Sequence, residues 1–137
     1  MIESISHITF IVKNVELMAQ FLRKIFDAEE VYDSVGKNFS VSREKFFLIG
    51  GTWIAVMEGE PVAERSYNHV AFGISDSEFD EYASRIKQLG VEVKPGRDRA
   101  EGEAQSIYFY DYDNHLFELH TGTLHERLLC YSERKTL

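Results

Sequence analysis

The sequence predicts an α+β fold made of two tandem β-α-β-β-β modules. The prediction rests on two observations. Alternating apolar segments and one amphipathic helix follow each other in the same order twice along the chain. Two residue types repeat with them, because His69 follows His7 by 62 positions and Gly122 follows Gly59 by 63. We therefore expect two similar curved sheets that together form a mixed sheet around a shared cleft.

The first module is predicted from three signals: alternation of apolar and polar residues in the strands, helical periodicity, and a pair of glycines. Its segments are, in order, SHITFIV, the helix VELMAQFLRKIF, EEVY, FFLIG and TWIAVMEG. The helix carries an apolar stripe that begins at Val15 and reaches Ile25. Gly50-Gly51 separates the last two segments and predicts a hairpin.

The second module repeats this plan with NHVAFGI, the helix EFDEYASRIKQLG, VEVK, SIYFY and HLFELH. Asp76 or Ser77 is expected to cap the helix, and Gly90 to end it. The last two strands form a hairpin around DYDN, where His115 is expected to stabilise the turn. We expect one domain over residues 1–127, with module one at about 1–60, module two at about 66–122 and a tail at 128–137.

Composition narrows the classes of function. A chain of 137 residues suits one domain or two small modules that share a core. The formal net charge of -8 argues against non-specific binding of nucleic acid or of an anionic membrane. No apolar run is long enough to span a bilayer, and the N-terminus has no secretory signal pattern. Cys130 is the one cysteine, which fits a reducing compartment, so we expect a cytoplasmic protein.

Glu118 is the residue that points to a metal. It lies in an apolar strand, where a carboxylate costs free energy unless it is paired, hydrogen-bonded or bound to a metal. His7 and His69 occupy equivalent strand positions, and the counterpart of Glu118 in module one is at or beside Ala55. Imidazole and carboxylate suit Mn²⁺, Fe²⁺ or Zn²⁺, and three protein ligands leave positions open for water or substrate. Each histidine taken alone is more often a hydrogen-bonded core or surface residue.

Several motifs resemble those of a known family. SHITF, YNHVAF and SIYFYDYDNHLFELHTG look like the vicinal oxygen chelate superfamily, and within it the fosfomycin resistance proteins. FSVSREKFFLIGGTWIAVMEG is most similar to the epoxide hydrolase type, and the resemblance runs from Met1 to about Arg127. It implies an enzyme that uses Mn²⁺, or another divalent ion, to add water to the oxirane of a small phosphonate antibiotic, giving a vicinal diol and conferring resistance. It also implies a homodimer that exchanges modules, which fits the open sheet edges of each module.

The resemblance implies roles for particular residues. The metal ligands fall on His7, His69 and Glu118, and the general base on Glu44. Taken without the resemblance, Glu44 is more simply a solvated charge flanked by other charges in SREKFF. The substrate positions fall on Thr9, Trp53, Tyr67, Ser106, Tyr108 and Arg127. Arg97 and Arg99 lie in a segment that differs from the thiol-transferring relatives, and which cation of residues 94–105 meets the phosphonate stays open.

Three other functions compete with fosfomycin hydration. A thiol transferase of the same family would use the same metal site to open fosfomycin with glutathione or a similar thiol. A metal-free protein that sequesters a drug would lack the metal ligands, all three of which are present here. A dioxygenase or glyoxalase is a third alternative, and a fourth ligand at Ala55 would have favoured a glyoxalase.

Overall fold

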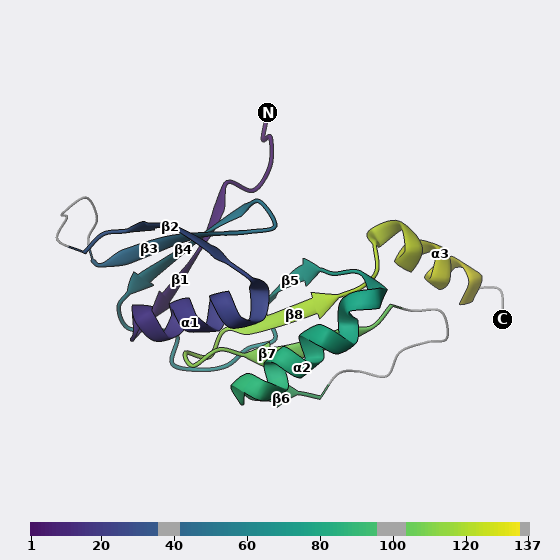
Figure 1. The fold of residues 1–137 in the computed structure, drawn as a ribbon. Helices are drawn as coiled ribbons and strands as arrows, with labels where there is room; N and C mark the ends of the chain where they lie inside the picture. Colours follow the sequence, from purple (N-terminus) through teal and green to yellow (C-terminus); the bar gives the residue numbers. More distant parts are fainter. Residues whose placement is uncertain (36–41, 96–103, 135–137) are drawn as a thin grey trace. The chain divides into compact units, whose positions relative to one another are not determined.

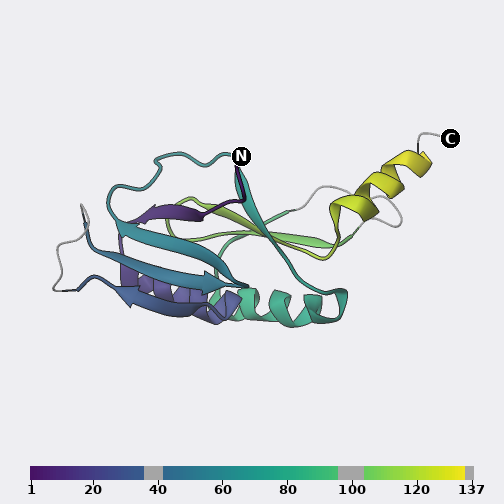
Figure 2. The same cartoon turned by 90° about the horizontal axis from the view of Figure 1, so that it is seen from above.

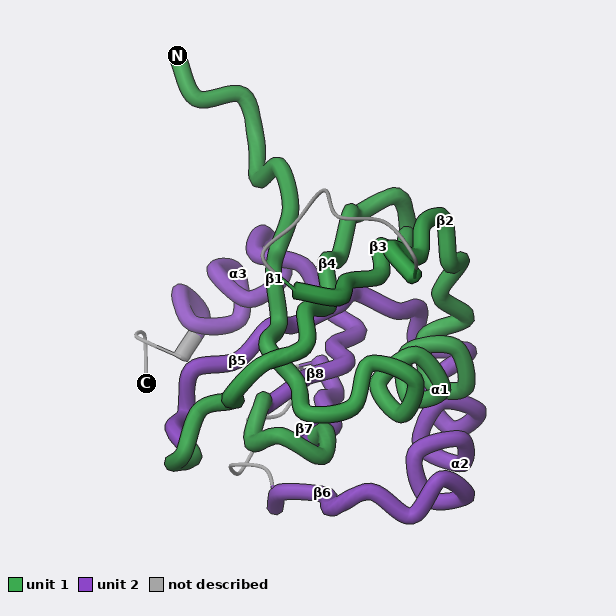
Figure 3. The backbone as a smooth tube through the Cα atoms, turned by 90° about the vertical axis from the view of Figure 1, so that its left-hand side faces the viewer, with its two compact units in different colours: residues 1–65, 111–115 green, residues 66–110, 116–137 purple. Residues whose placement is uncertain are grey.

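A computed structural model describes residues 1–35, 42–95 and 104–134. The chain divides into two compact units, shown in green and purple in Figure 3. Unit 1 holds residues 1–65 together with 111–115, and unit 2 holds residues 66–110 and 116–137. Each unit contains one four-stranded mixed sheet, and this confirms the predicted α+β class.

Unit 1 contains the first β-α-β-β-β series (Figure 1). Its elements are β1 (His7–Val12), α1 (Val15–Phe26), β2 (Glu29–Asp33), β3 (Glu44–Ile49) and β4 (Thr52–Glu58). The strand order is β1-β4-β3-β2, with β1 and β4 parallel and the other neighbours antiparallel. Every element of this module lies where alternation and helical periodicity predict it.

Local chemistry sets the ends of α1 and the turn between β3 and β4. The Asn14 side chain accepts a hydrogen bond from the Leu17 amide at 3.0 Å, which satisfies one amide of the first helical turn. The apolar stripe of α1 is buried, and Figure 2 shows the helix along one face of the first sheet. Gly50 and Gly51 have φ angles of 52° and 82°, as the tight hairpin requires.

Unit 2 contains the second series and a further helix. Its elements are β5 (His69–Gly73), the 3-10 turn η1 (Asp76–Glu78), α2 (Phe79–Leu89), β6 (Val93–Lys94), β7 (Ser106–Tyr110), β8 (Leu116–His120) and α3 (Leu124–Arg134). The strand order β5-β8-β7-β6 repeats that of unit 1, with β5 and β8 parallel. α3 runs through Arg127 without a break, so most of the expected tail is helical.

The predicted cap of the second helix is wrong. Neither Asp76 nor Ser77 caps α2, because both lie in η1, which precedes the helix. The Glu78 amide donates to the Ser75 carbonyl, so this amide is satisfied by the backbone of the 3-10 turn. At the other end, Gly90 ends the helix with φ 77°, as predicted.

The turn between β7 and β8 groups with unit 1. The Asp111 carboxylate accepts hydrogen bonds from the backbone amides of Asp113 and His115, and the Nδ1 atom of His115 lies 2.7 Å from it. His115 therefore stabilises the turn, as expected. Burial raises the pKa of Asp113, whose carboxylate accepts from the Lys13 amide at 3.5 Å.

The registers of the two sheets establish which positions are equivalent. In unit 1, Thr9 pairs with Ala55, and in unit 2, Ala71 pairs with Glu118. Ala55 is therefore the counterpart of Glu118, as the repeat predicts. None of the helices in residues 1–35, 42–95 and 104–134 is long and apolar enough to cross a membrane.

Candidate metal and substrate site

Glu118 and His69 meet on one face of the sheet in unit 2. Glu118 is 5% exposed, and its Oε1 atom lies 3.0 Å from Nε2 of His69. The Nδ1 atom of His69 lies 2.7 Å from the Tyr67 carbonyl oxygen, which can only accept a hydrogen bond, so Nδ1 donates. When the ring is neutral, the Nε2 lone pair then faces the carboxylate, which is the arrangement of a histidine oriented for metal binding.

A chain of hydrogen bonds fixes the other oxygen of Glu118. Ser106 Oγ donates to Glu118 Oε2 at 2.5 Å and lies 2.6 Å from Nδ1 of His120. Since the serine proton goes to the carboxylate, His120 donates through Nδ1. Arg127 Nη2 lies 3.4 Å from Nε2 of His120 and completes the chain. Alternation places Glu118 and His120 on one face, and the pairing of Ser106 with His120 brings the serine to them.

Unit 1 presents a second group of the predicted residues. Residues that pair directly across a sheet point to the same face, so the pairing of His7 with Trp53 and of Thr9 with Ala55 places all four together. The His7 and Trp53 rings are 4.2 Å apart. Trp53 Nε1 is buried and has no hydrogen-bond partner in the part of the chain that the structure describes.

Glu44 shares this face of unit 1. It pairs with Met57 on β4, which pairs in turn with Ile11 on β1, two residues beyond Thr9 in the alternation. Strand geometry places Glu44 roughly 13 Å along the sheet and roughly 10 Å across it from His7. Glu44 therefore cannot join His7 on one metal ion.

The Glu44 carboxylate is not paired by its charged neighbours. Glu44 is half-buried, and within the described residues its carboxylate forms no hydrogen bond or ion pair. Arg43 and Lys45 bind other carboxylates instead. A free carboxylate on the His7 face is available as a proton acceptor.

Two tyrosine rings lie beside His69, and a lysine lies over one of them. The Tyr67 ring centroid lies 5.0 Å from that of His69 and 5.9 Å from that of Tyr108, which is 5% exposed. Lys94 Nζ lies 5.7 Å from the Tyr67 ring centroid and pairs with Tyr108 across the sheet. Lys94 is not among the predicted substrate residues, although the alternation of VEVK, placed against SIYFY, indicates it.

The structure leaves two groups of predicted residues untested: two arginines of the proposed substrate site and the complete set of metal ligands. Arg97 and Arg99 lie outside the described residues. His69 and Glu118 meet within unit 2, while His7 belongs to unit 1. Across residues 1–35, 42–95 and 104–134, no group of three or more His, Cys, Asp and Glu side chains could hold a metal ion. The trio of metal ligands therefore stays a prediction, whereas the imidazole and carboxylate of unit 2 fit a divalent ion.

Comparison with known proteins decides the family. The model of the Glyoxalase/Bleomycin resistance protein/Dioxygenase superfamily matches residues 4–119. The chain belongs to this superfamily. This confirms the resemblance seen in the sequence, since vicinal oxygen chelate is another description of the same fold and family.

Fosfomycin resistance proteins are among its most similar relatives. The chain is 61% identical to the fosfomycin resistance protein FosX of Listeria monocytogenes serovar 1/2a over 133 residues, which cover 97% of this chain and 100% of that protein. A metallothiol transferase FosB of Staphylococcus haemolyticus is 37% identical and covers 98% of this chain and 95% of the relative.

The chain is also similar in structure to a fosfomycin resistance protein. A single-site variant of FosX from Listeria monocytogenes, in complex with Mn(II) and 1S,2S-dihydroxypropylphosphonic acid, superposes with a TM-score of 0.89. It is 60% identical, and the match covers 94% of this chain and 99% of that chain. The fold of this chain is therefore that of the FosX proteins.

Proposed function

We propose that the protein is a Mn²⁺-dependent hydrolase that adds water to the oxirane of fosfomycin and so confers resistance to this antibiotic. The observation that carries the proposal is the relative solved with Mn(II) and a dihydroxypropylphosphonic acid, which is 60% identical to this chain. That acid is the diol expected from fosfomycin and one water molecule. The proposed substrate is therefore a small phosphonate epoxide.

The proposed metal ligands are His7, His69 and Glu118. The contact of Glu118 with His69 supports this set, because a divalent ion would neutralise a buried carboxylate and accept the imidazole lone pair. Mn²⁺, when bound, supplies Lewis-acid stabilisation of the oxirane oxygen as the ring opens. Other divalent ions could take its place.

Glu44 is the proposed general base. Its carboxylate takes a proton from water as the water oxygen forms a bond to one oxirane carbon. The bond from that carbon to the ring oxygen breaks, the electron pair stays on the ring oxygen, and a proton completes the second hydroxyl. Two observations support this role: the carboxylate has no hydrogen bond or ion pair to any described residue, and it lies on the His7 face.

The remaining side chains are proposed to hold the substrate. We assign this role to Thr9, Trp53, Tyr67, Arg97, Arg99, Ser106, Tyr108 and Arg127. Lys94 adds a cation beside Tyr67 and Tyr108, where a phosphonate would need positive charge. These groups would keep the reacting oxirane carbon turned towards the water molecule.

The proposed assembly is a homodimer in which two chains exchange modules. His7 of one subunit would then complete the site with His69 and Glu118 of the other. The support is that these ligands lie in different units and that each unit has open sheet edges. We also propose that the protein acts in the cytoplasm, which suits a chain with one cysteine.

The test follows fosfomycin by phosphorus NMR in the presence of Mn²⁺ and without thiol. The wild type should form the diol, and Glu44→Gln should lower turnover by about 10²–10⁴ because it keeps the size and loses the basicity. Affinities for Mn²⁺ and fosfomycin should change little. The rate should also rise with pH along an acidic limb that the variant lacks.

Glu58→Gln is the matched control, since it removes an exposed carboxylate from the neighbouring strand by the same isosteric change. It should leave turnover unchanged. Wild-type turnover in Glu44→Gln would contradict the proposal.

Thiol transfer is the second candidate. The relationship to a metallothiol transferase at 37% identity favours keeping it under test. The same NMR assay distinguishes the two reactions, because a transferase would leave fosfomycin unchanged until a thiol is added. An absolute requirement for thiol would replace hydration by this activity.

A further inference from the structure

We propose that Lys45 and Arg43 are positioning residues for Glu44, and that they act from the opposite face of the sheet. This inference rests on the proposed role of Glu44 as the base. It assigns a purpose to a charged network that neither binds the metal nor faces the substrate.

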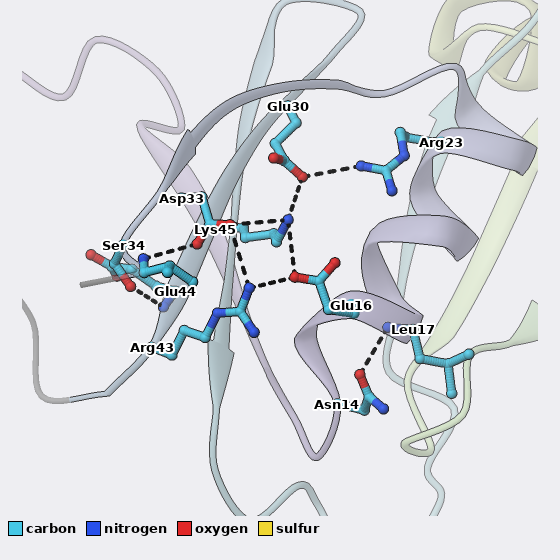
Figure 4. Close-up of polar contacts among 11 residues, drawn as sticks. Asn14, Glu16, Leu17, Arg23, Glu30, Asp33, Ser34, Arg43, Glu44 and Lys45 are labelled. Carbon is cyan, nitrogen blue, oxygen red and sulfur yellow. Dashed lines mark hydrogen bonds and ion pairs between the residues drawn. The ribbon is translucent and has the colours of Figure 1, made fainter. Parts of the chain in front are cut away.

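The network joins three elements of unit 1, as Figure 4 shows. Lys45 Nζ, on β3, lies 2.7 Å from Glu30 Oε1 and 3.4 Å from Asp33 Oδ2, and both carboxylates belong to β2. It also lies 3.4 Å from Glu16 Oε1, in the first turn of α1. Arg43 pairs with the same Glu16 and Asp33. Lys45 and Arg43 thereby tie the start of β3 to both neighbouring elements.

The charges in the network balance. Three carboxylates face three cations, and these are Glu16, Glu30, Asp33, Arg23, Arg43 and Lys45. The Lys45 side chain is only 5% exposed. Burial disfavours its charged form, but hydrogen bonding and attraction to Glu30 outweigh that effect and raise the pKa of Lys45. The lysine is therefore charged and held at neutral pH.

Glu44 lies between the two anchored residues. Because strand neighbours alternate, the side chains of Arg43 and Lys45 leave one face and that of Glu44 leaves the other. The backbone of Glu44 is also fixed, since its amide donates to Ser34 Oγ at 2.8 Å and its carbonyl accepts from the Ser34 amide at 3.0 Å. Anchors on both sides thus set the direction in which Glu44 points.

The equivalent place in unit 2 shows another solution. By register, Ser106 is the counterpart of Glu44, and Ile107 is the counterpart of Lys45. Ser106 is held by hydrogen bonds on its own face, and its neighbour Ile107 is apolar. Within the described residues, the Glu44 carboxylate has no such partners on its own face. The side chains that restrain Glu44 are therefore Arg43 and Lys45, which lie on the opposite face of the sheet.

The charged network is expected to matter more for the geometry of Glu44 than for the stability of the fold. A buried ion network is often matched or exceeded in stability by apolar side chains of similar volume, so it is weak evidence for stability. Catalysis is more sensitive to geometry, because a shift of about 1 Å in a reacting group can cost about 10²-fold in rate. The network should accordingly affect turnover more than folding or binding.

Lys45→Met is the main test, because it keeps the length of the side chain and removes the charge. We expect kcat for hydration to fall by about 10-fold or more, with KM and Mn²⁺ affinity within about 2-fold of wild type. Lys45→Arg should recover much of the loss. In the Glu44→Gln background, Lys45→Met should cause no further loss, because its effect passes through Glu44.

Glu16→Gln is a milder second variant, since this side chain is 53% exposed and the change should not prevent folding. It should give a smaller fall in kcat with the same dependence on Glu44. Glu81→Gln is its matched control, because Glu81 is 60% exposed and pairs with Arg85 at 2.9 Å on α2, so it takes no part in the network. This control should leave kcat unchanged.

The outcomes separate this inference from the proposed function. An equal loss of kcat in the wild-type and Glu44→Gln backgrounds would overturn positioning, and so would wild-type kcat in both Lys45→Met and Glu16→Gln. If Lys45→Met does not fold, as judged by circular dichroism, Glu16→Gln decides. Wild-type turnover in Glu44→Gln would instead remove the proposed function itself.

Discussion

The two units share one strand order but differ in the polarity of the side chains at equivalent positions. On the site face of unit 2, Ser106, Glu118 and His120 form a hydrogen-bonded row across two strands. Their counterparts in unit 1 are Glu44, Ala55 and Met57, which pair across the sheet in the same register. In unit 1 the row thus contains a single carboxylate, and its neighbours offer no polar group to bind it.

This difference suggests a division of roles. A metal ligand benefits from fixed orientation, and the hydrogen bonds around Glu118 provide it. A base needs an oxygen that can accept a proton, and the apolar neighbours Ala55 and Met57 offer Glu44, the proposed base, no hydrogen bond. The proposed metal ligand and the proposed base thus differ in the hydrogen bonds that their neighbours offer.

The largest expected effect tests whether His7 of unit 1 and Glu118 of unit 2 bind the same metal ion. His7→Ala and Glu118→Ala should each weaken Mn²⁺ affinity by more than about 10-fold and abolish hydration, because each removes a proposed ligand. Mixing the two inactive proteins should restore part of the activity if subunits exchange modules, since one site of each heterodimer keeps all three ligands. Phosphorus NMR and Mn²⁺ titration measure both effects.

The control for this experiment mixes Glu118→Ala with His69→Ala. Both substitutions lie in unit 2, so a heterodimer of these two variants has no intact site and should stay inactive. Lack of rescue in the first mixture, after exchange has been verified by mass spectrometry, would count against the swapped homodimer.

A smaller effect is expected when the row of unit 2 is interrupted. Ser106→Ala removes the donor to Glu118 and the acceptor for His120, so Mn²⁺ affinity should fall by about 10-fold. Calorimetric titration without fosfomycin isolates this effect from substrate binding. Ser132→Ala, on the exposed part of α3, is the control. Unchanged Mn²⁺ affinity with a raised KM would show that Ser106 contacts only the phosphonate.

The smallest effect concerns the charges behind Glu44. Burial opposes ionisation of Asp33, but hydrogen bonds from the Val35 amide and the Arg43 guanidinium outweigh it and lower the pKa of this carboxyl group. A lowered pKa in the folded state stabilises the protein above the pKa of the unfolded chain, and the benefit is lost as the pH falls through the folded value. Asp33→Asn should therefore lower the free energy of unfolding at pH 7 by at most about 1 kcal/mol.

Urea unfolding at pH 7 and near pH 3 measures this difference. It should be smaller at the lower pH, because the stabilising contribution of the charge is lost as the pH falls from the pKa of the unfolded chain through the lowered pKa of the folded state. A difference that is as large at pH 3 as at pH 7 would mean that Asp33 acts through packing and not through its charge.

The sequence predicts the fold well because its signals are local. Strand alternation, the stripe of α1 and the pair Gly50-Gly51 each act within a few residues, and the structure confirms them. The cap of α2 was missed because Ser, Asp and Glu alternate through residues 75–78, and several of them could cap a helix. In the structure these residues form a 3-10 turn, and a backbone hydrogen bond takes the place of a side-chain cap. The type of any single residue does not predict this turn.

The site is predicted in part. The equivalence of Ala55 and Glu118 follows from the repeat, and the structure confirms it. The charges that flank Glu44 favour a solvated segment when the sequence is taken alone, whereas Arg43 and Lys45 bind Glu16, Glu30 and Asp33 on the other face of the sheet. Those partners lie 10 to 29 positions away in the sequence, so only the folded chain shows which charges meet.

The stacking of Trp53 on His7 has a spectroscopic consequence. Trp53 is the single tryptophan of the sequence, so all indole fluorescence comes from the face that carries His7. Its buried N–H has no acceptor among the described residues, and such an indole should emit at short wavelength. A paramagnetic ion bound through the neighbouring imidazole would quench this emission. With His7 as the proposed ligand, Trp53 fluorescence should therefore report metal binding in titrations without an added label.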